Sequence, residues 1–154
     1  MKSQGEIEAA VCDGIARFQQ EFIGRGPRDI QAHLIGTLLV VRLQGVLTPA
    51  ERQLIAPPVG VGAAARNGGD GTLANGNGHA GHDGDVDNGN GRSLLKQIRA
   101  HMVATGRPRL ATIVEVAVGV KLVSVHHDIS TITGEELLVF SLADQPACRP
   151  KRRP

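Results

Sequence analysis

The chain has almost no aromatic residues. Its 154 residues include no Trp, no Tyr and three Phe, so a hydrophobic core has to be built mainly from Leu, Ile and Val. Proteins that bind single-stranded nucleic acid usually stack the bases on exposed aromatic rings. Because such rings are nearly absent, we expect no nucleic-acid partner.

Cysteine is scarce, and long hydrophobic runs are missing. Cys12 and Cys148 have neither metal-ligand nor redox spacing, which predicts two free thiols in a reducing compartment. Glu6 and Glu8 lie where a signal peptide would need apolar residues, and no apolar run reaches the ~18 residues of a membrane span. These features predict a cytoplasmic protein without a transmembrane segment.

The small net charge is concentrated at the C-terminus. The formal charge is 17 − 15 = +2, but Arg149, Lys151, Arg152 and Arg153 contribute four positive charges, which leaves 2 − 4 = −2 for the rest. Residues 145–154 are therefore interpreted as a basic, Pro-rich tail. Such a tail can contact anionic surfaces weakly, although a solvated chain end is its commoner role.

Glycine, by contrast, is abundant, with 20 residues in the chain. Residues 57–91 are mainly Gly, Asn, Asp and Ala with almost no large apolar side chain. Such a segment cannot bury enough surface to offset the entropy that folding would cost it. The sequence predicts a single domain formed by residues 1–56 and 92–144, interrupted by a disordered Gly/Asn-rich insert at 57–91.

Apolar residues at helical spacing predict two main helical regions. Ser3 begins a capping box before a helix over 4–23, and Thr48 begins a second capping box before a short helix. A further helical pattern covers 92–119, where Pro108 must kink or split the helix. The residues expected to face the core in this last region are Leu94 or Leu95, Ile98, Met102, Leu110, Ile113, Val114 and Ala117.

Alternating apolar residues predict two β-hairpins, over 29–47 and over 120–142. The fold class that buries every apolar stripe most simply is α+β, with a four-stranded antiparallel sheet (two hairpins) and helices packed on one face, in the order α-β-β-α-α-β-β. The outer face of the first hairpin is only partly polar, so we expect a helix or another subunit to cover part of it. Its residues are His33, Ile35, Leu38, Val40, Arg42 and Gln44.

A Ser-His-Asp set occurs on one predicted strand. Strand alternation places Ser124, His126, Asp128 and Ser130 on one face. Such neighbours are ~7 Å apart at Cα, whereas a nucleophile and its base need heavy atoms at roughly 2.6–3.2 Å. We therefore favour a polar sheet face over a catalytic triad. His126 and His127 point to opposite faces and cannot easily share a metal ion.

Two arginine-rich turns could bind an anion. Arg25 and Arg28 belong to a Gly-Arg-Gly-Pro-Arg turn, and Arg107 and Arg109 belong to a similar Gly-Arg-Pro-Arg sequence. Glycines expose backbone N–H groups, and guanidinium groups bind phosphate or carboxylate with two parallel hydrogen bonds. An arginine-lined corner would form if the two turns lie close together. The alternative, which we favour for the first turn, is an ordinary helix stop.

Three of these segments together resemble the MpsC-type domain family, named for a sodium-translocating membrane-potential-generating system of bacteria. The resemblance depends on Gly24-Arg25-Gly26-Pro27, on Val41-Arg42-Leu43-Gln44-Gly45-Val46-Leu47-Thr48-Pro49-Ala50-Glu51, and on Gly119-Val120-Lys121 with His126-His127-Asp128-Ile129-Ser130-Thr131-Ile132-Thr133-Gly134-Glu135. It implies an association with ion-coupled membrane machinery and assigns no catalytic residues. The chain differs from the family pattern at His127, and its insert separates two helices that the pattern joins closely.

The leading hypothesis is a non-enzymatic cytoplasmic accessory or regulatory domain that forms a homo-oligomer and uses neither cofactor nor metal. The resemblance implies membrane transport subunits as partners, and membrane association through such a partner. A first alternative is a small-ligand or anion-binding sensor, and a last one is a hydrolase that uses His126. The candidate ligand-binding residues are Arg25, Arg28, Arg107, Arg109, His126 and Asp128.

Overall fold

The structure, a computed structural model, describes residues 1–56 and 86–151. Its first helix is α1, Gln4–Phe18, which continues as a π-helical turn, η1, Gln19–Ile23. The predicted capping box at Ser3 is present. The helix ends at Gly24, whose φ of 93° lies in the left-handed region that favours glycine.

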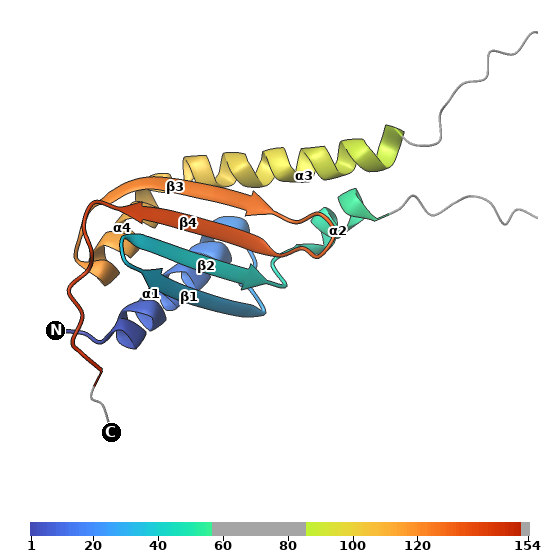
Figure 1. Ribbon diagram of the computed structural model, residues 1–154. Coiled ribbons are helices and arrows are strands. Elements are labelled where there is room, and N and C mark those ends of the chain that lie inside the picture. The colour runs from blue at the N-terminus through green and yellow to red at the C-terminus, as the bar shows by residue number, and fades with distance from the viewer. Residues whose placement is uncertain (57–85, 152–154) are drawn as a thin grey trace, which may run out of the picture.

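Four strands form one antiparallel sheet, as the sequence predicts (Figure 1). They are β1, Asp29–Ile35, β2, Leu38–Gln44, β3, Leu122–Ile129, and β4, Glu136–Leu142. The strand order is β1-β2-β4-β3, so the two hairpins join through β2 and β4. Val41 pairs with Leu138 at the centre of this junction.

Three further helices follow the first hairpin: α2, Pro49–Ile55, α3, Val86–Thr105, and α4, Arg107–Val118. Pro108 lies in the first turn of α4, so it separates α3 from α4 as predicted. Helix α3 begins at Val86 and not at Arg92. Gly91, in the first turns of α3, lies directly against α2, because a Cβ there would collide with the backbone oxygen of Leu54. Helices α2 and α3 are therefore in direct contact although the insert separates them in sequence.

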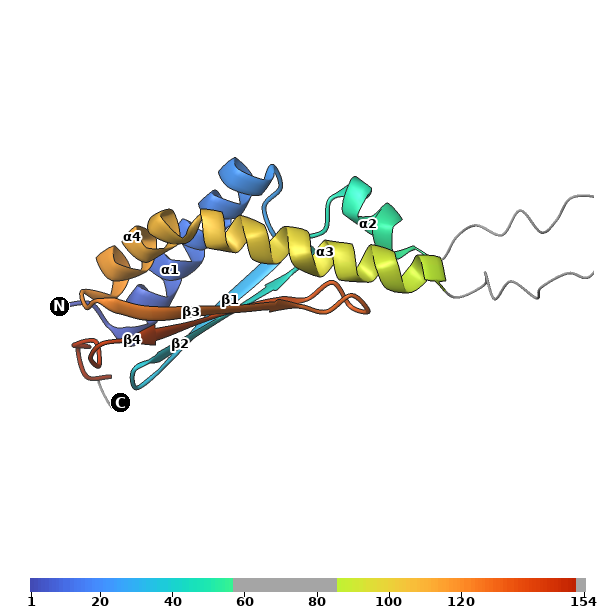
Figure 2. The ribbon, with the colours of Figure 1, turned by 90° about the horizontal axis from the view of Figure 1, so that it is seen from above.

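All helices lie on one side of the sheet (Figure 2). Most predicted core residues of α1 and of the strands are buried between the two layers, whereas Phe22, Ile30 and Val125 are partly buried. Val123, predicted on the inward face of its strand, is 59% exposed. In α3, however, the buried stripe is Leu95, Arg99 and Val103, whereas Ile98 is 37% exposed. The prediction of Ile98 as a core residue is wrong. Helix α3 turns the side that carries Arg99 toward the sheet, so Ile98, one position earlier, lies partly at the surface.

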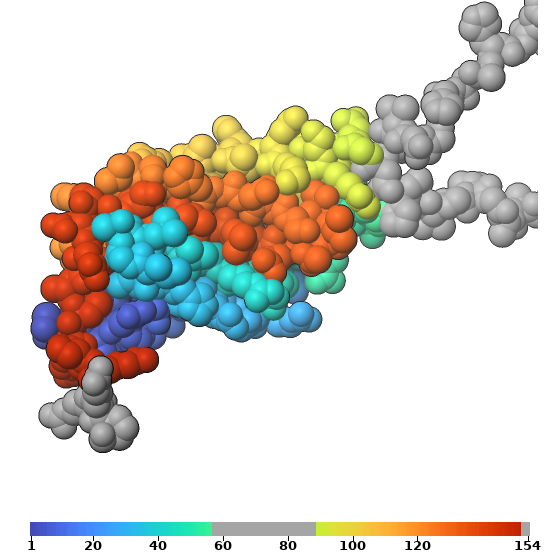
Figure 3. All heavy atoms as spheres, in the orientation of Figure 1, coloured from blue at the N-terminus to red at the C-terminus, as the bar shows by residue number. Residues whose placement is uncertain are grey.

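The opposite face of the sheet lies at the surface, as Figure 3 shows for β2, β4 and β3. Ile35 is 63% exposed and Leu38 is 37% exposed on this face. No helix of the described residues covers it. The expected covering helix is therefore not found in this part of the chain, and another subunit stays a prediction.

The insert and the tail fall partly outside the described residues. Of the predicted disordered insert, residues 57–85 lie outside the description, and 86–91 form the start of α3. In the tail, the Arg149 N–H donates to the carbonyl of Lys2 at 2.9 Å, and Cys148 packs against the core. The tail is therefore held against the N-terminus as far as Arg149, and residues 152–154 are outside the description.

Candidate functional site

The most unusual feature of the core is a completely buried arginine. Arg99 belongs to α3 and has no exposed surface. It occurs on the same helical face as Leu95 and Val103, so the packing of that face against the sheet places its guanidinium in the interior. A buried charge is tolerated only with good hydrogen-bond partners.

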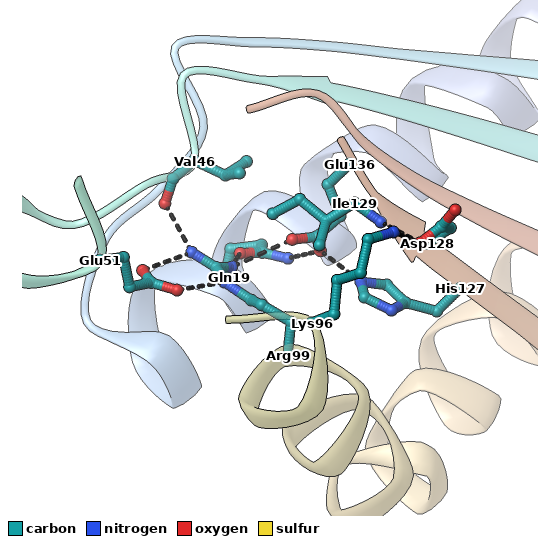
Figure 4. Close-up of polar contacts among 9 residues, drawn as sticks. All are labelled: Gln19, Val46, Glu51, Lys96, Arg99, His127, Asp128, Ile129 and Glu136. Carbon is teal, nitrogen blue, oxygen red and sulfur yellow. Dashed lines mark hydrogen bonds and ion pairs between the residues drawn. The ribbon is translucent and has the colours of Figure 1, made fainter. Parts of the chain in front are cut away.

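Glu51 and Val46 bind one side of the guanidinium (Figure 4). Nε and Nη2 of Arg99 donate to Oε2 and Oε1 of Glu51 at 2.6 and 2.7 Å, a bidentate pair. Nη2 also donates to the carbonyl of Val46 at 2.8 Å. Glu51 is at the same time the capping-box glutamate of α2, because it accepts the Thr48 N–H at 3.0 Å. Arg99 thus joins α3 to the start of α2 and to the loop before it.

Glu136 and Gln19 bind the other side. Nη1 of Arg99 donates to Oε2 of Glu136 at 3.1 Å and to Oε1 of Gln19 at 3.4 Å. Nε2 of Gln19 donates to Oε1 of Glu136 at 2.8 Å. Gln19 and Glu136 are fully buried. Gln19 is the first residue of the π-helical turn, and such turns inside helices frequently occur at functional sites.

His127 approaches this cluster from β3. Its Nε2 lies 3.6 Å from Oε1 of Glu136, and 7% of its side chain is exposed. This nitrogen is buried and has no hydrogen-bond partner among the described residues. We define the buried charge cluster as Gln19, Glu51, Arg99, His127 and Glu136. It contains one guanidinium, two carboxylates and one imidazole.

The electrostatics of Glu51 follow from these contacts. Burial raises the pKa of its carboxyl, but hydrogen bonds from Arg99 and Thr48 and the charge of Arg99 together outweigh burial and lower the pKa below its ordinary value. The folded state therefore favours the carboxylate. The cluster links α2, α3, η1, β3 and β4 through polar and charged side chains, of which Gln19, Arg99 and Glu136 are fully buried.

The Ser-His-Asp set on β3 assembles only in part. Ser124 Oγ lies 3.2 Å from Nε2 of His126, so the expectation that strand spacing keeps these two side chains out of reach is wrong. Asp128 instead accepts from Nζ of Lys96 at 2.8 Å, and this hydrogen bond lowers the pKa of Asp128. His126 and His127 point to opposite faces, as predicted. Among the described residues no group of three or more His, Cys, Asp or Glu side chains is placed to hold a metal ion.

Arg28 and Arg107 do not come together, so no arginine corner that includes both is formed. Nη2 of Arg107 donates to the carbonyl of Val123 at 3.3 Å, near the start of β3. Arg109 pairs with Glu21 and lies over the ring of Phe18.

Arg28, in contrast, donates its backbone N–H to Gln44 at 2.9 Å. The sheet register places Gln44 at the end where β3 finishes, so Arg28 lies at the opposite end from Arg107. Arg25 is half-buried in the turn after η1.

Gln19, Arg99, His127 and Glu136 were missed as site residues. The signal for Arg99 is a single arginine within an apolar helical stripe. Glu136 gives a similar signal, because it alternates in phase with Leu138 and Phe140, which both face the core. A charged residue in phase with core positions predicts a buried partner of opposite charge.

The fold and the cluster define the class of this protein: an α+β domain with helices on one face of a four-stranded antiparallel sheet and a buried ion cluster at one end. The chain matches the family model described as Na⁺-translocating membrane potential-generating system (MpsC) over residues 3–65 and 86–144. It belongs to this family, as the resemblance predicts.

A curated relative gives no further assignment. The chain is 27% identical over 143 residues to "Uncharacterized protein YbcI" of Bacillus subtilis (strain 168), and the match covers 93% of this chain and 90% of the relative. No solved structure matches the chain. No helix in the described ranges is long and apolar enough to cross a membrane.

Proposed function

We propose that this protein is a non-enzymatic cytoplasmic accessory or regulatory component of a Na⁺-translocating membrane-potential-generating system. The observation that carries this proposal is the family match, which includes both hairpins and all four α-helices. The protein works through contacts with transport subunits, which hold it at the membrane. In this proposal a partner subunit supplies the membrane attachment.

The buried position of the charge cluster supports a role in protein–protein contacts. The most elaborate polar arrangement, the buried charge cluster, is largely buried and joins five elements of the fold (Figure 4). Such a cluster gives the domain a defined shape at some cost in stability. A fixed shape serves a protein that is recognised by partners.

We further propose that the uncovered sheet face mediates a homo-oligomer. Ile35, Leu38 and Val40 lie on this face, and Leu137 and Val139 extend it across β4. The β-strand alternation that buries Leu39 and Leu138 makes these side chains point outward. Two copies that pair through this face would bury the exposed apolar side chains.

The oligomer is tested by analytical ultracentrifugation at micromolar concentration. Ile35→Glu is expected to shift the wild-type oligomer to monomer, because a charge in a sheet-to-sheet contact is desolvated without a partner. Ile132→Glu is the matched control, since Ile132 is 84% exposed in the turn between β3 and β4. A wild-type monomer, or equal effects of the two changes, would contradict the oligomer.

The accessory role is tested in cells that natively produce the protein. Deleting its gene is expected to reduce the Na⁺-dependent membrane potential, and capture from detergent-solubilised membranes is expected to recover transport subunits. Complementing the deletion with the Ile35→Glu variant tests whether the accessory role requires the oligomer. An unchanged membrane potential together with no captured transport subunit would refute the proposed function.

A further inference from the structure

A small polar pocket lies beside the buried charge cluster, at the end of the sheet where β2 finishes and β4 begins. Its volume is about 210 Å³. It is lined by Arg28, Arg52, residues 45–47 and residues 133–134. Ligand pockets for drug-sized molecules are typically ~300–1,000 Å³, so this one suits a smaller molecule.

The charges around the pocket are of one sign. Arg28 and Arg52 both line it, and no carboxylate does. Neither arginine has an ion-pair partner within the part of the chain that the structure describes. Arg42, Arg99 and Arg109, in contrast, each pair with a glutamate. Two unneutralised guanidinium groups at one polar pocket favour an anionic ligand.

Two glycines bring the walls of the pocket together. Gly45 has φ of 67°, and a Cβ there would come within 2.6 Å of the Cβ of Arg28. Gly134 has φ of 73°, and a Cβ there would come within 3.1 Å of Leu47. Larger residues at these two positions would push the Arg28 turn and the β3–β4 turn away from the loop between them. The pocket depends on backbone that only glycine readily adopts.

The loop between these walls has free hydrogen-bond donors. Within the described ranges, the N–H groups of residues 45–47 donate to no protein acceptor, whereas the next N–H, of Thr48, donates to Glu51. Successive free N–H groups beside a residue with positive φ form the kind of concave surface that binds anions in proteins.

The buried charge cluster holds this loop in place. The carbonyl of Val46 accepts from Nη2 of Arg99 at 2.8 Å, and Val46 and Leu47 are buried. The fully buried Arg99 therefore fixes the loop from the core side, while the pocket side of the loop faces solvent. A rigid loop loses little entropy when a ligand binds.

We propose that this pocket binds a small oxyanion, such as a phosphate or a short carboxylate, through Arg28 and Arg52. Each guanidinium offers paired N–H donors that match the oxygens of such an anion. The site differs from the arginine corner considered in the sequence analysis. It shares Arg28 with that corner but contains Arg52 and none of the other three arginines. The proposal goes beyond the accessory role and does not depend on it.

The test is a titration of the full-length protein with inorganic phosphate and, separately, with acetate, at constant ionic strength maintained with chloride. Calorimetry gives the dissociation constants. We expect Arg28→Ala and Arg52→Ala each to weaken binding of the preferred anion about 10-fold or more, because each removes charge-assisted hydrogen bonds. Arg17→Ala is the matched control, since Arg17 is exposed on α1 and outside the pocket. It is expected to change the constant less than about twofold.

A second measurement guards against folding effects. In the wild-type protein, phosphate or acetate is expected to shift the amide NMR signals of residues 45–47 and 133–134 first. Circular dichroism checks that the variants are folded. We expect them to fold, because the replaced arginine side chains are exposed. The proposal is overturned if neither anion binds the wild-type protein, if the three alanine variants bind equally, or if the shifted signals lie elsewhere.

Discussion

Replacing Arg99 by methionine tests how the buried charge cluster contributes to stability. Methionine keeps much of the side-chain volume but leaves Glu51 and Glu136 buried without their cation. Breaking a buried ion pair by removing one partner costs about 3–5 kcal/mol. With a urea m-value of about 1.5 kcal/mol/M, a loss of about 4 kcal/mol lowers the unfolding midpoint by roughly 2.5 M.

A triple variant separates unpaired charge from lost packing. Glu51→Gln and Glu136→Gln remove both carboxylate charges, and each amide keeps an oxygen for the Thr48 or Gln19 hydrogen bond. Added to Arg99→Met, they are expected to recover at least about 2 kcal/mol, because no buried charge is then unbalanced.

The assay is urea unfolding followed by far-ultraviolet circular dichroism, since the chain has no Trp or Tyr for fluorescence. Lys96→Met is the matched control in the same helix, because Lys96 and Asp128 form a largely exposed pair. It is expected to cost less than about 1 kcal/mol. Equal losses for Arg99→Met and Lys96→Met, or no recovery in the triple variant, would refute this reasoning.

Two further predictions follow from single contacts. Gly91→Ala is expected to destabilise the protein by about 1–3 kcal/mol, because its Cβ meets the Leu54 backbone, whereas Gly89→Ala, with open space around it, is expected to stabilise α3 by up to about 1 kcal/mol. Equal urea midpoints would contradict the close α2–α3 packing. The lowered pKa of Glu51 means that its carboxylate stabilises the fold fully above the pKa of the unfolded chain and loses this contribution as pH falls through the lower, folded value. The stability difference between wild type and Glu51→Gln should therefore shrink from about pH 5 downward, and a constant difference between pH 7 and pH 3 would contradict it.

The contact between α2 and α3 has a consequence for the insert. Residues 57–85 connect two helices that pack against each other, with Gly91 placed on the α2 backbone. The buried charge cluster crosses the same junction, since Glu51 belongs to α2 and Arg99 to α3. Helices α2 and α3 thus pack together although residues 57–85 lie between them in the sequence.

The arrangement of helices and strands could be predicted from the sequence because its signals are local. Capping residues at Ser3 and Thr48 fix helix starts, Pro108 splits a helix, and period-two alternation marks the strands. The candidate site was harder to predict. In α3, helical periodicity is compatible with a core-facing stripe through Ile98 and with one through Arg99. Only the contact with the sheet shows that the stripe through Arg99 is buried.

The α+β class, the two hairpins and the family are predictable from the amino-acid sequence, because each follows from short patterns along the chain. Tertiary packing alone decided which charges meet: Arg99 with Glu51 and Glu136, and Arg28 with Arg52 at one pocket. The physical reason is that ion pairing and pocket formation depend on distances between residues far apart in sequence. Those distances are set only when the apolar faces of both hairpins and the helices are buried together.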